Sequence, residues 1–280
     1  MITLHILKNK KLMNLIAYLI LLILIPTVLL ASDKSILVQS TTSTKNSGFY
    51  DFILPLFTAD SGIKVNVVAV GTGAAIKNAR NCDGDVLLVH SPEDEQKFIA
   101  DGFSTKRHNI MHNDFVIVGP VADPAGIVGM QDVGSAFAKI ASSGAKFASR
   151  SDSSGTHTKE LSIWKKIGLD PVNESGRWYL ETGSGMGKTL NITIGTNAYT
   201  LVDRASWFSF SSKYDHRVLL EGDSHLFNPY GVMLIDKNKC PNVKSAEGQS
   251  FINWLTSYKG QRTIGLFTID GQKVFIPTSK

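Results

Sequence analysis

The sequence predicts an α/β fold, arranged as two lobes or as one large domain. Short apolar strands alternate with amphipathic helices along most of the chain, which is typical of a mostly parallel sheet. About 250 residues follow an N-terminal export segment, more than a single hydrophobic core usually holds. The chain contains no internal repeat and no low-complexity stretch, so a repeat architecture is not expected.

The first elements are read from apolar spacing. Ile36–Val38 is a short apolar strand, and the polar residues 39–47 that follow predict a turn. Apolar side chains from Phe49 to Phe57 recur at helical spacing, and Gly62 ends that helix. The chain therefore opens as strand, loop and helix.

The same pattern continues through the rest of the chain. Ser91, Pro92 and Glu93 begin a helix, because they supply an N-cap, a first-turn proline and a first-turn acid. Other helices are predicted at 74–80, 135–142, 156–167 and 247–255, and one around Leu190. Other strands are predicted at 65–70, 85–89, 115–118, 147–149, 178–180, 199–201, 218–220 and 231–235.

An export segment is predicted at residues 1–32. Lys8, Lys10 and Lys11 precede an uncharged apolar run, 12–30, and small residues follow it, as in a signal peptide. The run is also long enough to stay as a membrane anchor, so cleavage is left open, but export to the periplasm is expected either way. No cysteine follows closely, which disfavours a lipid anchor at that point.

The charge of the mature chain excludes one class of partner. Without the export lysines the formal charge of +5 falls to +2, and no dense basic run remains. Nucleic acid is therefore not an expected partner. Cys82 and Cys240 could pair in an oxidising compartment, but two cysteines do not define a disulfide framework, and pairing is left open.

Polar loops rich in hydroxyls and glycines follow several predicted strands. They are residues 40–44 (STTST), 71–73 (GTG), 150–156 (RSDSSGT) and 183–189 (GSGMGKT). Loops that follow strands converge at the carboxyl edge of an α/β sheet, where ligands bind. Their amides, hydroxyls and helix N-termini favour a tetrahedral oxyanion, because such an ion accepts hydrogen bonds from every side.

The loop at 150–156 is the strongest of these candidates. Arg150 offers a planar fork for two oxygens of an anion, and Asp152 is expected to pair with Arg150 and hold it in place. The loop at 40–44 could equally be a solvated turn, and Gly71 and Gly73 could be turn glycines.

Sequence signals for an enzyme are weak. Gly187-Lys188-Thr189 matches the end of a nucleotide P-loop, but Thr182 stands where the first glycine belongs. Neither a serine-hydrolase elbow nor metal-ligand spacing is present, so neither a metal site nor a cofactor is expected. An exported nucleotide- or phosphoryl-handling enzyme remains the alternative from another class.

Several long motifs resemble one family. The STTST loop and the stretches 67–98, 112–127, 178–191 and 226–232 are together similar to the tungstate-binding proteins of ABC importers, the TupA type. The resemblance implies a type II periplasmic-binding-protein fold: two lobes joined by two hinge crossings, with the ligand cleft between them. We expect the crossings near 113–120 and 221–230, with residues 33–115 and 227–280 in lobe 1 and 116–226 in lobe 2.

The resemblance also implies a function and a site. The predicted function is capture of tungstate by a monomer without catalytic activity or cofactor, and delivery to a membrane permease with its ATPase. Molybdate is the near alternative ligand and phosphate the more distant one. The candidate ligand-binding residues are Ser40, Thr41, Thr42, Thr72, His90, Arg150, Ser153, Ser154, Gly155, Thr156 and Thr189.

His90 bears on the choice of anion. Phosphate-binding relatives carry an aspartate at the corresponding strand end, which accepts the proton of phosphate. A histidine there is expected to donate to a fully deprotonated dianion instead, and so to disfavour phosphate. The alternative is that His90 is a buried strand-end residue that never touches the ligand.

Overall fold

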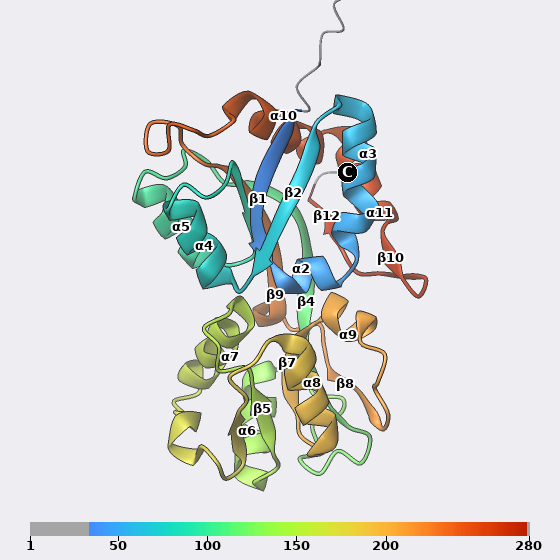
Figure 1. Ribbon diagram of the computed structural model, residues 1–280. Coiled ribbons are helices and arrows are strands. Elements are labelled where there is room, and N and C mark those ends of the chain that lie inside the picture. The colour runs from blue at the N-terminus through green and yellow to red at the C-terminus, as the bar shows by residue number, and fades with distance from the viewer. Residues whose placement is uncertain (1–33, 279–280) are drawn as a thin grey trace, which may run out of the picture. The chain divides into compact units, whose positions relative to one another are not determined.

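One long strand, β4 (His108–Pro120), belongs to both main sheets of the molecule. Residues 108–114 of β4 pair with β9 (Phe227–Leu234), and residues 115–120 pair with β7 (Thr200–Asp203) and β8 (His216–Leu220). The structure, a computed structural model, describes residues 34–278, in which no helix is long and apolar enough to cross a bilayer. Figure 1 shows β4 and β9 running between two lobes.

Lobe 1 surrounds the sheet of order β12-β4-β9-β3-β1-β2. Its strands β1 (Ser35–Thr41), β2 (Lys64–Val70) and β3 (Val86–Val89) are parallel neighbours, so their carboxyl ends lie at one edge. The other elements of lobe 1 are α2 (Thr42–Asn46), α3 (Phe49–Ser61), α4 (Thr72–Arg80), α5 (Pro92–Ala100), α10 (Ser245–Thr256), α11 (Tyr258–Leu266), β10 (Thr268–Ile269), β11 (Gln272–Lys273) and β12 (Ile276–Pro277).

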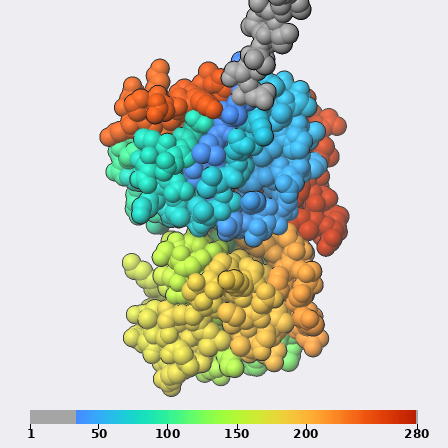
Figure 2. All heavy atoms as spheres, viewed as in Figure 1, coloured from blue at the N-terminus to red at the C-terminus, as the bar shows by residue number. Residues whose placement is uncertain are grey.

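Lobe 2 is formed by the middle of the chain, drawn from green to orange in Figure 2. Its strands β5 (Phe147–Ser149) and β6 (Tyr179–Glu181) are parallel, and the Ala148 amide donates to the Tyr199 carbonyl just before β7. Its other elements are α6 (Val133–Ser143), α7 (Gly155–Lys166), η1 (Pro171–Glu174), α8 (Met186–Gly195), α9 (Arg204–Ser209) and η2 (Ser224–Leu226).

Each lobe has its own hydrophobic core. Phe57 and Phe251 pack edge to face in lobe 1, where α3 and α10 cover one side of the sheet. In lobe 2 the rings of Phe137, Phe147 and Trp164 contact one another between α6, α7 and β5. Two cores joined through β4 and β9 are the two-lobed α/β fold that the sequence predicts. The exact lobe boundaries stay a prediction.

Cys82 and Cys240 form a disulfide bond. The two cysteines are 158 residues apart, and both belong to lobe 1, where Cys82 follows α4 and Cys240 follows β9. The bond therefore links the two chain segments that build this lobe. A disulfide is compatible with an oxidising compartment such as the periplasm.

The structure corrects several sequence predictions. The expected turn at 39–47 contains the end of β1 and the short helix α2. The strand expected at 115–118 is longer and begins at His108, so the crossing expected at 113–120 lies inside β4. Helices α9 and α11 were not predicted, because α9 has six residues and α11 (YKGQRTIGL) is mostly polar.

Candidate functional site

A small cavity lies where strand ends of both lobes meet. Lobe 1 contributes the loops after β1, β2 and β3, and lobe 2 contributes the loop after β5. The cavity has a volume of about 10 Å³, near the 10–15 Å³ that one water occupies on the same measure. It is lined by Thr41, Thr42, Ser43, Val70, Gly71, Thr72, His90, Arg150, Ser154, Gly155 and Thr156. Organic ligands fill cavities of roughly 300–1,000 Å³, so this one is too small for them.

Two helices of full length begin at the cavity, one from each lobe. Gly71 and Thr72 open α4, and Ser154 and Gly155 open α7. Neither first turn contains an acidic residue, although acids are favoured there because they compensate the positive end of the helix dipole. Their absence leaves the backbone N–H groups and the dipoles available to an anion.

Helix α5 also begins near the cavity, but its first turn is acidic. Its first turn carries Glu93, Asp94 and Glu95, which satisfy its N-terminus from within the chain. The Ser91 amide donates to Glu95 at 2.6 Å, and the Ser91 hydroxyl donates to Asp94 at 2.7 Å. An anion is therefore favoured at the N-termini of α4 and α7 and disfavoured at the N-terminus of α5.

Arg150 supplies the permanent positive charge of the cavity. Its side chain is only 5% exposed, and Nη2 donates to Asp152 at 2.5 Å, the pairing that the sequence predicts. Its Nε–H is buried and has no hydrogen-bond partner among residues 34–278. A buried donor of this kind costs free energy unless a ligand accepts from it. The guanidinium is thus held by Asp152, while its buried Nε–H has no partner among the described residues.

Hydrogen bonds behind the Arg150 loop hold it in place. The Ser149 hydroxyl accepts from the Ser151 amide at 3.2 Å and donates to buried Glu160 at 2.7 Å. Glu160 also accepts from Trp164 and Tyr179. Burial raises the pKa of Glu160 to about 7, although these three donors oppose the shift.

The lobe 1 wall presents neutral groups. Thr41 caps α2: its Oγ1 accepts from the Thr44 amide at 3.4 Å and bonds the hydroxyl groups of Ser43 and Thr44. Ser43 and Gly71 line the cavity but are absent from the predicted ligand residues. Both lie in loops that the sequence identifies as candidate ligand loops, 40–44 and 71–73, so their position after a strand could have predicted that they line the cavity.

His90 lies at the back of this wall, after β3. Its Nδ1 is 2.9 Å from Oδ1 of Asn228, its Nε2 is 3.3 Å from the Ser43 hydroxyl, and its ring stacks on Tyr230. Because Oδ1 of an amide only accepts, Nδ1 carries the proton and Nε2 of a neutral ring is an acceptor. The donation to the ligand that the sequence analysis assigns to His90 therefore requires a doubly protonated ring.

Three predicted ligand residues do not line the cavity. The Ser40 hydroxyl bonds Tyr50 and the Leu88 carbonyl, and Ser153 is an exposed residue whose amide donates to His157. The Thr189 hydroxyl bonds Thr182 and the carbonyl oxygens at the start of α8. Their roles as ligands stay predictions.

The glycine-rich loop before α8 does not resemble a nucleotide site. Lys188 is exposed, and the hydroxyl of Thr189 is used within its own loop. A P-loop needs both side chains for phosphate and magnesium. Within residues 34–278, moreover, no cluster of His, Cys, Asp or Glu could hold a metal ion.

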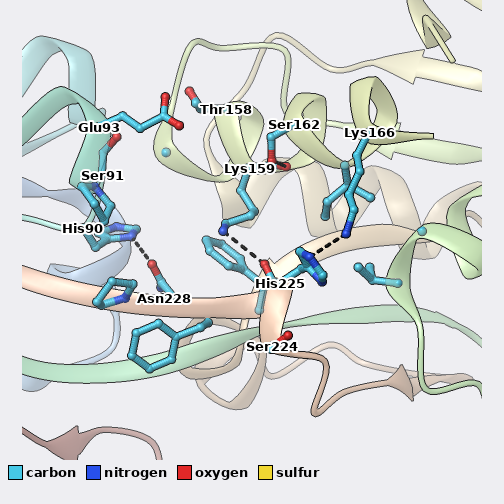
Figure 3. A pocket seen from close by; sticks show the side chains of 18 residues that line it. His90, Ser91, Glu93, Thr158, Lys159, Ser162, Lys166, Ser224, His225 and Asn228 are labelled. Atoms are coloured by element: carbon cyan, nitrogen blue, oxygen red, sulfur yellow. Dashed lines mark hydrogen bonds between the residues drawn. The ribbon is translucent and has the colours of Figure 1, made fainter. Parts of the chain in front are cut away.

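A second cavity, of about 440 Å³, shares His90 and Gly155 with the first (Figure 3). Its basic side chains are partly occupied, because Lys159 donates to the His225 carbonyl and Lys166 bonds Nε2 of His225. Much of the remaining wall is apolar, and Glu93 adds a negative charge. The smaller cavity is therefore the candidate anion site, because donors converge there without an opposing carboxylate in the lining.

Comparison with known proteins identifies the family. Residues 30–259 match the model of the PBP superfamily domain. The chain is 39% identical over 249 residues to the tungstate-binding protein TupA of Peptoclostridium acidaminophilum, covering 88% of this chain and 86% of that one. The chain belongs to the TupA family. As a member of this family of transporter binding proteins, it is not an enzyme.

Two solved structures of the family share its fold. The tungstate-binding protein TupA of Desulfovibrio alaskensis G20 is 43% identical to this TupA-family chain with a TM-score of 0.78, covering 88% of this chain and 100% of that one. The tungstate ABC transporter structure from Geobacter sulfurreducens is also 43% identical with a TM-score of 0.76, covering 83% and 98%. The type II binding-protein fold expected from the resemblance is thereby confirmed.

Proposed function

We propose that this protein captures tungstate in the small cavity between its lobes. The observation that carries the proposal is buried Arg150, whose Nε–H has no partner among the described residues and which lies among hydroxyls and two acid-free helix N-termini. Such a lining satisfies a tetrahedral dianion from both lobes. The related proteins that are named for tungstate support that ion among the tetrahedral anions.

Delivery to an ABC importer completes the proposed function. The relative from Geobacter is described as a tungstate ABC transporter, which supports a membrane permease as the partner. We extend this to an ATPase that drives the permease and to a monomeric receptor in the periplasm, exported by residues 1–32. That export segment lies outside the described residues.

Molybdate is the second ligand that the cavity favours, because it is also a tetrahedral dianion. The lining distinguishes both ions from phosphate less sharply than expected, because Nε2 of a neutral His90 accepts from the Ser43 hydroxyl and leaves that hydroxyl as an acceptor toward the cavity. An acceptor can pair with a protonated phosphate oxygen. Discrimination against phosphate therefore has to come from the donors and from the size of the cavity.

Calorimetric titration of anion-free mature protein with tungstate, molybdate, sulfate and phosphate tests the proposal. We expect tungstate to bind most tightly, molybdate next, and sulfate and phosphate far more weakly. Tight phosphate binding in a protein that does not bind tungstate would contradict the proposal. Magnesium-dependent ATP binding would instead support the alternative of an exported nucleotide-handling enzyme.

A further inference from the structure

A chain of side-chain hydrogen bonds connects the cavity to lobe 2 through both hinge strands. Asn113 in β4 donates to Asp203 at 3.4 Å, Asn228 in β9 donates to Asn113 at 2.6 Å, and His90 bonds Asn228 at 2.9 Å. Ser43 then meets Nε2 of His90 at 3.3 Å at the wall of the cavity. All five side chains are buried, so solvent does not compete for these bonds.

The direction of every bond in this chain follows from its first member. A carboxylate only accepts, so Asn113 turns its NH₂ to Asp203 and its carbonyl oxygen to Asn228. Asn228 in turn gives its NH₂ to Asn113 and its carbonyl oxygen to His90, as Figure 3 shows for the latter pair. Nδ1 of His90 must therefore be protonated, and a neutral ring accepts at Nε2.

The tautomer determines what the Ser43 hydroxyl offers to a ligand. When His90 is neutral, the hydroxyl donates to Nε2 and turns lone pairs toward the cavity, where they oppose an anion. When Nε2 carries a proton, the ring donates to Ser43 and frees that hydroxyl to donate to the anion. The lobe 1 wall consists of donors alone only in the second state.

We propose that oxyanion binding takes up a proton from solvent onto Nε2 of His90, which becomes a charged imidazolium paired with the bound dianion. The proton reverses the last bond of the chain, so that Nε2 of His90 donates to the Ser43 hydroxyl and Ser43 donates to the anion. The inference rests on the proposed function, because it requires an oxyanion in this cavity. It assigns to His90 the role of setting how affinity depends on pH.

The charges around His90 support a change of protonation on binding. Burial lowers the pKa of His90, and Arg150 lowers it further, whereas Asp203 and the Asn228 hydrogen bond raise it. The stacked phenol of Tyr230, at 4.6 Å, is neutral because burial raises its pKa well above the usual value. A dianion adds negative charge beside Ser43 and Arg150, so it raises the pKa of His90 in the complex.

Asp203, whose carboxylate sets the direction of these hydrogen bonds, has one oxygen without a partner in the described part of the chain. Oδ2 of Asp203 is buried and without a partner among residues 34–278, while Oδ1 accepts from the Ser206 amide and from Asn113. A positive charge on His90 therefore has a buried negative group on one side and the anion on the other.

The test measures protons taken up per anion. Sodium tungstate is titrated into the anion-free mature protein at pH 7.5, in buffers of different ionisation enthalpy, and the dependence of the heat on the buffer gives the proton count. We expect a fraction approaching one proton, and an affinity that falls up to tenfold per pH unit between the pKa values of His90 in the free and bound protein.

Two variants locate the proton. His90→Gln keeps a polar side chain that does not titrate, so we expect weaker binding, no proton uptake and an affinity independent of pH. His157→Gln is the matched control, because His157 in α7 accepts from the Ser153 amide in the Arg150 loop but does not line the cavity. We expect it to take up the wild-type number of protons.

Ring-nitrogen NMR of the ¹⁵N-histidine-labelled wild-type protein gives an independent measurement if His90→Gln does not fold. One imidazole is expected to change from neutral, with its proton on Nδ1, to doubly protonated on adding tungstate, also in His157→Gln. Tight tungstate binding without proton uptake overturns this inference and leaves the proposed function standing. Proton uptake that is lost in His157→Gln and kept in His90→Gln also overturns the inference. If the protein does not bind tungstate, both the inference and the proposed function are overturned.

Discussion

The two lobes contribute different chemistry to one cavity. Lobe 1 presents neutral hydroxyls and amides from the ends of β1 and β2, and His90 from the end of β3. Lobe 2 presents the permanently charged Arg150 and the N-terminus of α7. The difference indicates that lobe 2 supplies most of the affinity for negative charge, whereas lobe 1 determines which donors meet each oxygen.

Each wall is also backed by a buried glutamate, and the two differ in their partners. Glu95 behind lobe 1 pairs with the guanidinium of Arg107 and accepts from the Ser91 amide. Glu160 behind lobe 2 accepts only from neutral groups, those of Ser149, Trp164 and Tyr179. The lobe that presents the positive charge to the ligand thus has the uncompensated acid beneath it.

Removing the charge of lobe 2 is expected to have the largest effect. Arg150→Ala leaves a bound anion without its buried counter-ion, at a cost of about 3–5 kcal/mol, or more than about a hundredfold in affinity. Arg150→Lys keeps the charge but not the planar fork, so its affinity for tungstate should lie between those of the wild type and Arg150→Ala. Calorimetry with tungstate measures both. Arg217→Ala, at an exposed arginine of lobe 2, is the control. If the affinity of Arg150→Ala for tungstate is within threefold of that of Arg217→Ala, the anion does not bind at Arg150.

The two glutamates predict opposite effects on stability. Burial raises the pKa of Glu160 to about 7 in the folded protein, from 4.5, whereas at Glu95 the charge of Arg107 opposes the effect of burial. An acid whose folded pKa is raised stabilises the fold below pH 4.5, and this contribution is lost as pH rises to about 7, by about 3 kcal/mol. Glu160→Gln should remove this dependence and be at least as stable as wild type at pH 8. Glu95→Gln should be less stable than wild type at pH 8, because it leaves Arg107 nearly buried and without its charged partner.

Urea unfolding of the anion-free protein at pH 5.5 and pH 8 checks this pair of variants. The quantity of interest is the free energy of unfolding of each variant relative to wild type at the same pH, which removes the contribution of other titrating groups. Equal destabilisation by the two substitutions at pH 8 would show that the two acids have equivalent environments.

Much of the fold follows from local sequence, because its strands are apolar and its helices amphipathic. The core strands β1 to β3 and helices α3 to α7 were predicted within a few residues. What was missed depends on distant partners. Residues 108–114 (HNIMHND) are mostly polar, yet they extend β4 because β9, more than a hundred residues later, pairs with them.

The candidate site was predictable at the level of loops and less so at the level of atoms. Hydroxyl-rich loops after strands identified most residues of the cavity, since parallel strands end at a common edge. Composition could not show that Thr189 bonds its own loop, or that Asn228, 138 residues from His90, determines where the ring carries its proton. Both facts depend on side-chain orientation in the folded chain.

The smallest expected effect distinguishes two threonines that look alike in sequence. Thr72 lines the cavity from lobe 1, whereas the hydroxyl of Thr189 is bonded within the loop that opens α8. Thr72→Val removes one donor to the anion and should weaken tungstate binding by about 1 kcal/mol, or roughly fivefold. Thr189→Val should lower the free energy of unfolding by a similar amount and leave the affinity for tungstate unchanged. The reverse outcome, with affinity lost only in Thr189→Val, would place the anion beside α8 and give lobe 2 a larger share of the donors.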